Sequence, residues 1–288
     1  MMRGRAFGAG VIQRDEPDLQ KKEEHLKEFE NRCKQYKAIA PEFIELFKKY
    51  VECLVAGNKE EGLPLFQKVI DYLHSIRAFE IPADVFNEVE NPDEAAEQYT
   101  SNVNLWSKTN NIMPGEKAKA SGGITLESTL AGTLFNGLDF GVNYFTSDLL
   151  ANQWKQVSYN YVKNAKGTVT AHLLIGVNKE SVLYKTEADV VKKKLETGEV
   201  KSVVVRYYKA RAEGGDIHLE EFKTEVVSTA EQWEKLLAQT KSTVPVGEID
   251  TPTGKKQVVV KVDPNGRVFK AIQGYAHASE ARRGKGHR

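Results

Sequence analysis

The sequence is poor in cysteine. Its 288 residues include only Cys33 and Cys53, and neither belongs to a Cys-x-x-Cys pair or a Cys/His cluster. A disulfide framework and a structural zinc site are therefore not expected. We interpret both cysteines as small buried apolar side chains of a chain that folds in a reducing compartment, the cytoplasm.

Long hydrophobic runs and an excess of one charge are also missing. No stretch approaches the roughly 18 apolar residues of a membrane helix, and the start, MMRGRAFGAGVIQRDEPD, has no apolar signal-peptide core. The formal net charge is +1, although the chain closes on the basic run ARRGKGHR. We expect neither a membrane partner nor a nucleic-acid partner, because the basic residues gather only in this tail.

The common catalytic signatures are absent. The sequence has no GxxxxGK[ST], no GxGxxG after a strand, no HExxH and no GxSxG, and its six histidines are scattered. We therefore expect no metal site and no Ser-His catalysis. The residues left to carry chemistry are carboxylates, hydroxyls and tryptophans.

The pattern of apolar residues predicts helices first and strands later. Residues 1–17 are predicted to be a disordered leader, and 18–100 show helical spacing. Beyond about residue 165 the sequence predicts elements of both kinds. The expected class is α+β, with an N-terminal helical part packed on a largely short-stranded sheet flanked by helices: strands at 167–176, 181–186, 200–210 and 216–227, helices at 187–198 and 228–240, and a hairpin at 255–276.

One acid stands in an apolar setting. Glu127 lies within SGGITLESTLAGTLFNGLDF (121–140), where a carboxylate is costly unless something satisfies it. Two of the three tryptophans precede hydroxyl residues, in LWSKTN and QWKQVS, and Trp154 and Ser158 would share a helical face. Each feature alone also fits a structural role, namely helix capping for Glu127 and core packing for a tryptophan such as Trp233.

Together and in order these segments resemble the ADP-ribosyl cyclase family, the animal NAD glycohydrolase and cyclase enzymes. The segments are WSKTN, TLESTLAGTLFNGLDFG, QWKQVSYNYVKNAKGTVTAHLLIG and SVLYKTEADVV. The resemblance covers about residues 100–240. It implies an ADP-ribosyl cyclase-like catalytic region at 101–250, with NAD as substrate and no cofactor. Residues 251–288 are a hairpin extension and basic tail, and the hairpin at 255–276 has no counterpart in the family.

The resemblance also implies roles for individual residues. The catalytic carboxylate is the hardest to place, because an ungapped alignment puts Val191 there and a short deletion puts Glu187 or Asp189 there instead. We prefer Glu187; both acids also fit a simple helix N-terminal position. Glu127 would hold the nicotinamide amide. The implied substrate-binding residues are Trp106 and Trp154 as stacking walls, Ser107 and Ser158 for phosphate or ribose oxygens, Thr186, and Asn136.

The sequence departs from the family pattern at three points. The family's domains are secreted and rich in disulfides, whereas this chain has no cysteine after Cys53. The acid that follows the motif glutamate is Ser128 here, and the second acid of the pocket is Asn136. The balance between hydrolysis and cyclisation therefore stays open, as does the choice between NAD and NADP.

The sequence thus predicts an NAD-consuming hydrolase that breaks the nicotinamide–ribose bond. The leader, the basic tail and the lack of a signal peptide suggest a bacterial toxin or effector, translocated by a contractile injection or specialised secretion system. An immunity protein or an apparatus component would then be its partner. The alternative is a catalytically inactive NAD-binding protein, or a structural or cargo-adaptor protein of such a system.

Overall fold

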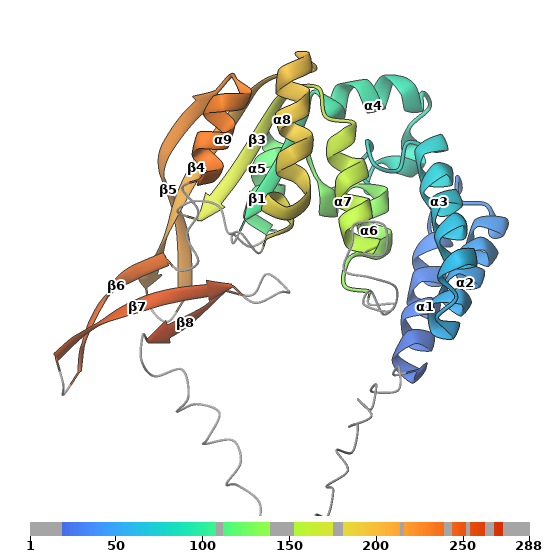
Figure 1. The fold of residues 1–288 in the computed structure, drawn as a ribbon, viewed down its shortest axis with the longest axis horizontal. Coiled ribbons are helices and arrows are strands. Elements are labelled where there is room, and N and C mark those ends of the chain that lie inside the picture. The colour runs from blue at the N-terminus through green and yellow to red at the C-terminus, as the bar shows by residue number, and fades with distance from the viewer. Residues whose placement is uncertain are drawn as a thin grey trace, which may run out of the picture.

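The computed structural model describes residues 19–107, 112–138, 153–174, 181–213, 216–238, 244–251, 254–262 and 268–272. Helices and a sheet lie side by side in it (Figure 1). None of the helices within these ranges is long and apolar enough to cross a membrane.

Three helices form the first part of the chain, as the apolar spacing predicted. They are α1 (Leu19–Cys33), α2 (Pro41–Ala56) and α3 (Lys59–Ser75). Pro41 suits the first turn of α2, and Gly57 ends that helix with a left-handed φ of 68°. The Asn58 side chain then accepts a hydrogen bond from the Glu61 amide and starts α3. A short 3₁₀ helix (Phe86–Glu88) and α4 (Pro92–Thr100) lead into the sheet.

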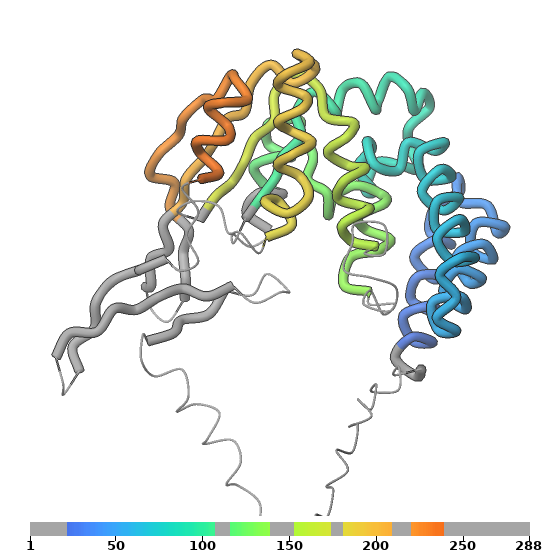
Figure 2. The backbone as a smooth tube through the Cα atoms, viewed as in Figure 1, coloured from blue at the N-terminus to red at the C-terminus, as the bar shows by residue number. Residues whose placement is uncertain are grey.

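A buried aromatic cluster joins these helices to the rest of the protein. The rings of Phe29 and Phe47 stack with centroids 4.0 Å apart, and Phe135 from α6 (Leu130–Phe135) lies 5.5 Å from Phe47. The apolar core continues from this cluster to the sheet without a break. Figure 2 shows the helical part beside α6 and α7, with the sheet beyond them. Cys33 and Cys53 are both buried and unpaired, so their interpretation as small core side chains is confirmed.

The main sheet has five strands in the order β2-β1-β3-β4-β5. The pairs β2–β1, β1–β3 and β3–β4 are parallel, and β5 pairs antiparallel with β4. The strands predicted from 167, 200 and 216 are confirmed, but β4 and β5 have 14 and 12 residues, so the expectation of short strands is wrong for them. The bounds are β1 Asn102–Ser107, β2 Ile124–Thr125, β3 Gly167–Leu174, β4 Val200–Glu213 and β5 Asp216–Val227.

The two faces of this sheet differ. Side chains alternate along a strand, and one face carries buried apolar residues such as Val103, Val169 and Val203. These belong to the same core as residues of α7 (Gln153–Lys163) and α8 (Ala188–Thr197), which cover that face (Figure 1). The other face carries polar residues, and α5 (Ile112–Ala120) lies beside its β1 and β2 edge.

The strand predicted at 181–186 is wrong, because the chain is helical there. Leu183–Glu187 forms a π-helical turn, in which the Ala188 amide donates to the Leu183 carbonyl five residues back. The Ser181 hydroxyl accepts a hydrogen bond from the Tyr184 amide and starts the turn. A short apolar run fits a strand or a buried helical segment equally well, and here the turn leads directly into α8, which ends at Gly198 as predicted.

The C-terminal elements follow the prediction more closely. The Thr229 hydroxyl caps α9 (Ala230–Ala238) through the Gln232 amide, and Trp233 is fully buried as the expected core anchor. Strands β7 (Gly254–Val262) and β8 (Val268–Ile272) form a second, antiparallel sheet together with β6 (Val244–Thr251), which the sequence did not predict. The pairing of β7 with β8 confirms the hairpin, whose predicted DPNG turn lies outside the described residues.

Candidate functional site

A buried carboxylate, Glu187, lies at the end of the π-helical turn. It is 6% exposed, and the hydroxyl of the fully buried Ser158 on α7 donates a 2.6 Å hydrogen bond to it. Burial raises the pKa of Glu187 to about 8, against the opposing effect of the Ser158 hydrogen bond, and the charge of Glu127 raises it further. In the ligand-free protein the carboxyl group is therefore mostly protonated at neutral pH.

A second carboxylate, Glu127, is held by a tryptophan. The indole Nε1–H of Trp106, near the end of β1, lies 3.2 and 3.1 Å from the two carboxylate oxygens of Glu127. Burial raises the pKa of Glu127, and the hydrogen bond from Trp106 partly offsets the rise. Glu127, the acid within an apolar stretch of the sequence, thus has a specific hydrogen-bond donor in Trp106.

The hydroxyls around Glu127 explain how the chain places it. Leu126–Ser128 form a 3₁₀ turn with a capping box between Thr125 and Ser128, and the Thr129 hydroxyl caps α6 by accepting from the Gly132 amide. A Cβ atom added at Gly132 would stand 1.8 Å from the Leu126 carbonyl oxygen, so only glycine allows the turn and the helix to pack this closely. Ser128 has a structural task where the family resemblance led us to expect an acid.

Both carboxylates line one cavity. Its volume is only about 30 Å³, room for about one water molecule. Tyr161 contributes a wall and is fully buried, with its hydroxyl 2.8 Å from the Ile124 carbonyl oxygen. Sequence reasoning missed Tyr161, although it follows Ser158 by three residues on the same helical face. The lining consists of Asn104, Leu105, Trp106, Leu126, Glu127, Tyr161, Val182 and Glu187.

Four of the predicted site residues are therefore close together: Trp106, Glu127, Ser158 and Glu187. Trp154 is half-buried against the core, and it is absent from the lining of this cavity as the described residues form it. Asn136 is exposed after α6, where its carbonyl accepts from Arg32. The side chain of Ser107 lies outside the described part of the structure.

Thr186 and Asp189 belong to a different cavity. This space of about 720 Å³ lies between α7 and α8, and its lining includes Lys155, Lys163 and Lys193. Thr186 is buried there, and its hydroxyl has no hydrogen-bond partner within the described ranges. The structure thus separates Asp189, the second choice for the catalytic acid, from the cavity that holds Glu187.

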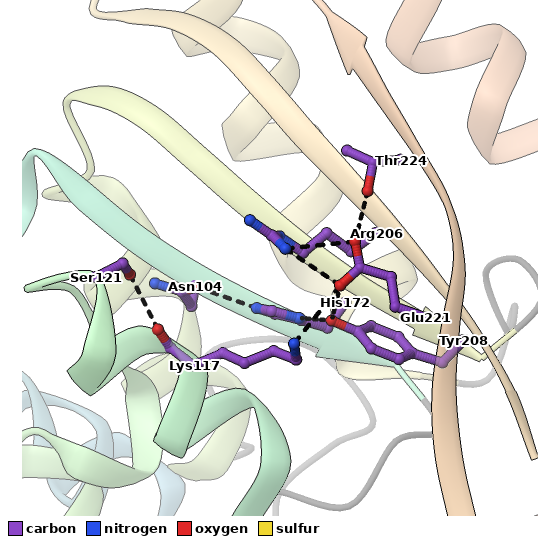
Figure 3. A network of polar contacts seen from close by, with 8 residues as sticks. All are labelled: Asn104, Lys117, Ser121, His172, Arg206, Tyr208, Glu221 and Thr224. Atoms are coloured by element: carbon purple, nitrogen blue, oxygen red, sulfur yellow. Dashed lines mark hydrogen bonds and ion pairs between the residues drawn. The ribbon is translucent and has the colours of Figure 1, made fainter.

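A further polar network lies on the polar face of the sheet (Figure 3). His172 is fully buried, with Nδ1 3.0 Å from the Tyr208 hydroxyl and Nε2 3.0 Å from the Asn104 side-chain oxygen. Burial lowers the pKa of His172 to about 4, and the charges of Arg206 and Lys117 lower it further, so the ring is neutral at pH 7. Since the Asn104 oxygen only accepts, Nε2 carries the proton, while Nδ1 faces the Tyr208 hydroxyl, which also lies 3.3 Å from a carboxylate oxygen of Glu221.

Comparison with known proteins gave matches among solved structures alone. A scan against protein-family models and a search of the curated proteins found no match. The chain is similar in part to a mutant ADP-ribosyl cyclase, with 20% identity over 48% of this chain and 59% of that chain and a TM-score of 0.32. An ADP-ribosyl cyclase complexed with N1-cIDPR gives 21% identity, the same coverage and a TM-score of 0.29. Apo porcine CD38 gives 16% identity over 62% of this chain and 83% of that chain, with a TM-score of 0.29. The chain thus spans 59% of the length of the two cyclase chains that it matches.

Proposed function

We propose that this protein cleaves the nicotinamide–ribose bond of NAD⁺, as an NAD glycohydrolase, an ADP-ribosyl cyclase or both. The observation that carries the proposal is the meeting of Glu187 and Glu127 in one cavity beside Trp106. Two buried acids and an aromatic wall suit a reaction that develops positive charge on a ribose ring.

Glu187 would act on that charge. Nicotinamide leaves as a neutral molecule, so the enzyme needs little acid catalysis and mainly has to stabilise a ribosyl cation. The cationic ring of the entering substrate lowers the pKa of a nearby carboxyl group, so Glu187 would lose its proton as NAD⁺ binds. Ser158 then keeps the resulting carboxylate in place through its 2.6 Å hydrogen bond.

Trp106 and Glu127 would bind the leaving group. An aromatic face attracts the cationic nicotinamide ring, and the indole at the same time orients Glu127. A carboxylate oxygen of Glu127 can accept a hydrogen bond from the nicotinamide amide. From there Glu127 would influence whether water or the adenine ring captures the ribosyl cation.

Substrate entry requires the cavity walls to separate. A volume of about 30 Å³ cannot hold a nicotinamide ring. The walls come from β1, the 3₁₀ turn, α7, the π-helical turn and Val182 just before it, so small shifts between these elements would open the cavity. Closure behind the substrate would then exclude water from the ribosyl cation.

The test is release of nicotinamide from NAD⁺ by the purified protein without added metal. Glu187→Gln should lower kcat by at least about 100-fold, the usual cost of losing an electrostatic partner of the transition state. Asp189→Asn is the matched control, because Asp189 is exposed two residues further along and should leave the rate unchanged. No turnover of NAD⁺ or NADP⁺ would refute the proposal. Loss of activity in Asp189→Asn alone would move the catalytic role there, and product analysis separates linear from cyclic products.

The alternative is an inactive NAD-binding protein, or a structural or cargo-adaptor protein. Two observations favour it: the Ser128 hydroxyl is committed to a capping box, and the ligand-free cavity holds about one water molecule. Saturable NAD⁺ binding in calorimetry without any product would support this reading. Delivery by an injection system and an immunity partner stay predictions; NAD depletion in cells that express the wild type but not Glu187→Gln would support the toxin proposal.

A further inference from the structure

One face of the main sheet is polar where parallel sheets are usually apolar. Parallel strands are normally buried on both faces and read as continuous hydrophobic runs. Here the strands alternate instead, and their polar positions adjoin one another in the register: Asn102 faces Thr168, and Asn104 faces Thr170. The next strand adds Arg206 beside His172. Buried polar groups are costly unless they are hydrogen-bonded, and here Asn104 and His172 are both buried and share a hydrogen bond.

This face is hollowed by a cavity of about 500 Å³. None of the described residues that line it carries a carboxylate. Two of them, Lys117 and Arg206, are positively charged. These two cations share one acid, Glu221, at 3.5 and 3.1 Å (Figure 3). Two positive charges against one negative charge leave the cavity positive, and an anionic group of a ligand would balance it.

The floor of the cavity offers unused hydroxyls. Thr170 is only 9% exposed, and its hydroxyl makes no hydrogen bond to the described residues, nor does that of Thr168. The neighbouring Asn104 and His172 are held by each other and by Tyr208, so the floor is rigid. Fixed hydroxyl, amide and imidazole groups beside two cations suit a ligand that combines an anion with several hydroxyls.

We propose that this cavity binds a phosphorylated sugar, with the phosphate at Lys117 and Arg206 and the sugar hydroxyls at Thr168, Thr170 and Asn102. Asn104 lines both this cavity and the Glu187 cavity, but Lys117, Arg206, Thr168 and Thr170 line this one and are absent from the lining of the other as the described residues form it. The proposal goes beyond the NAD reaction and does not depend on it. The sugar phosphate could be a free metabolite or the ribose phosphate of a nucleotide.

Calorimetric titration of the full-length protein with ribose 5-phosphate and with AMP tests the proposal. At least one should bind saturably, and the tighter of the two identifies the source. Ribose alone and inorganic phosphate alone should bind at least tenfold more weakly than the sugar phosphate, because each satisfies only half of the site. Arg206→Gln should weaken binding at least tenfold, and Thr170→Val roughly fivefold, the equivalent of one hydrogen bond.

Two variants serve as controls. Lys223→Gln removes a cation from the same sheet, but that ammonium group lies over the Tyr207 ring and not in the cavity, so binding should persist. Glu187→Gln should also leave binding intact, which separates this site from the proposed NAD site. Absence of binding by both ligands, equal binding of inorganic phosphate, or unchanged affinity in both Arg206→Gln and Thr170→Val would overturn the proposal. Melting curves confirm that each variant is folded.

Discussion

The Ser158 hydroxyl donates a 2.6 Å hydrogen bond to the Glu187 carboxylate, and both side chains are shielded from solvent. One residue comes from α7 and the other from the π-helical turn, 29 positions later in the chain. The hydrogen bond favours the charged form of an acid that burial keeps protonated. Ser158 therefore controls the pH at which Glu187 becomes a carboxylate.

The first prediction concerns Ser158→Ala. Loss of the hydrogen bond should raise the pKa of Glu187 above its value of about 8. If the carboxylate is the active form, kcat/KM increases with pH through this pKa, and the variant's profile shifts to higher pH. Activity near neutral pH falls and recovers in part at about pH 9. Ser75→Ala, a helical serine on α3, is the control that should keep the wild-type profile. An unshifted profile in Ser158→Ala would remove Glu187 from the pH dependence.

The second prediction concerns stability. The native Glu187 carboxyl binds its proton more tightly than it does in the unfolded chain, where the pKa is near the ordinary 4.5. Its contribution to stability is therefore lost progressively as the pH rises from about 4.5 to about 8. Glu187→Gln lacks this penalty, so its melting temperature relative to the wild type should be higher at about pH 8 than at about pH 5. A difference that is constant or reversed would contradict the raised pKa.

The third prediction separates the two candidate stacking tryptophans. Trp106 lines the cavity and binds Glu127, whereas Trp154 packs against the core. Addition of NAD⁺ should therefore change the tryptophan fluorescence of the wild type and of Trp154→Phe, but not that of Trp106→Phe. Trp106→Phe should also lower kcat/KM by roughly tenfold, because Glu127 loses a charge-assisted hydrogen bond. A signal that disappears only in Trp154→Phe would restore the stacking role to that residue.

The fourth prediction concerns Gly132. Alanine there would bring a methyl group to 1.8 Å from the Leu126 carbonyl oxygen, so the 3₁₀ turn and α6 must separate. We expect a loss of more than about 3 kcal/mol in the free energy of unfolding. Gly57→Ala is the comparison, because its φ of 68° imposes strain but the space around it is open, and it should cost only about 1 kcal/mol. Denaturant unfolding measures both, and equal losses would show that the close approach at Gly132 does not matter.

Local signals predicted much of the fold. The helical pattern breaks at Pro41, where α2 begins, the helix predicted at 187–198 ends at Gly198, and the β-branched run from Val200 is a strand. The strand prediction for 181–186 was wrong because a run this short shows neither helical nor strand periodicity. The segment is helical through its packing against α7 and α8. The parallel pairing of β1 with β3 joins segments more than 60 residues apart, which no local pattern specifies.

The site was predictable only in part. The misfit of Glu127 and the hydroxyl at Ser158 are visible in the sequence, and the structure places both beside the cavity. Tyr161 and Asn104 left no comparable signal, because a tyrosine in a helix and an asparagine in a strand are ordinary until their neighbours across the sheet are known. The polar face of β3 was present in the alternation of Thr168, Thr170 and His172, but its meaning required the parallel register.

The π-helical turn at Leu183–Glu187 contains one residue more than a regular α-helical turn would need. The extra residue rotates the side chains at the start of the turn by about 100° around the helix axis, relative to those of α8. Deletion of Lys185, an exposed residue of the turn, should convert it to regular α-helix while α8 stays packed on the sheet. Residues of the turn before the deletion, such as Leu183, would then shift around the helix axis relative to Glu187. Insertion or loss of a single residue in this turn is thus a route by which homologous chains could exchange the acid that faces the cavity without altering the core.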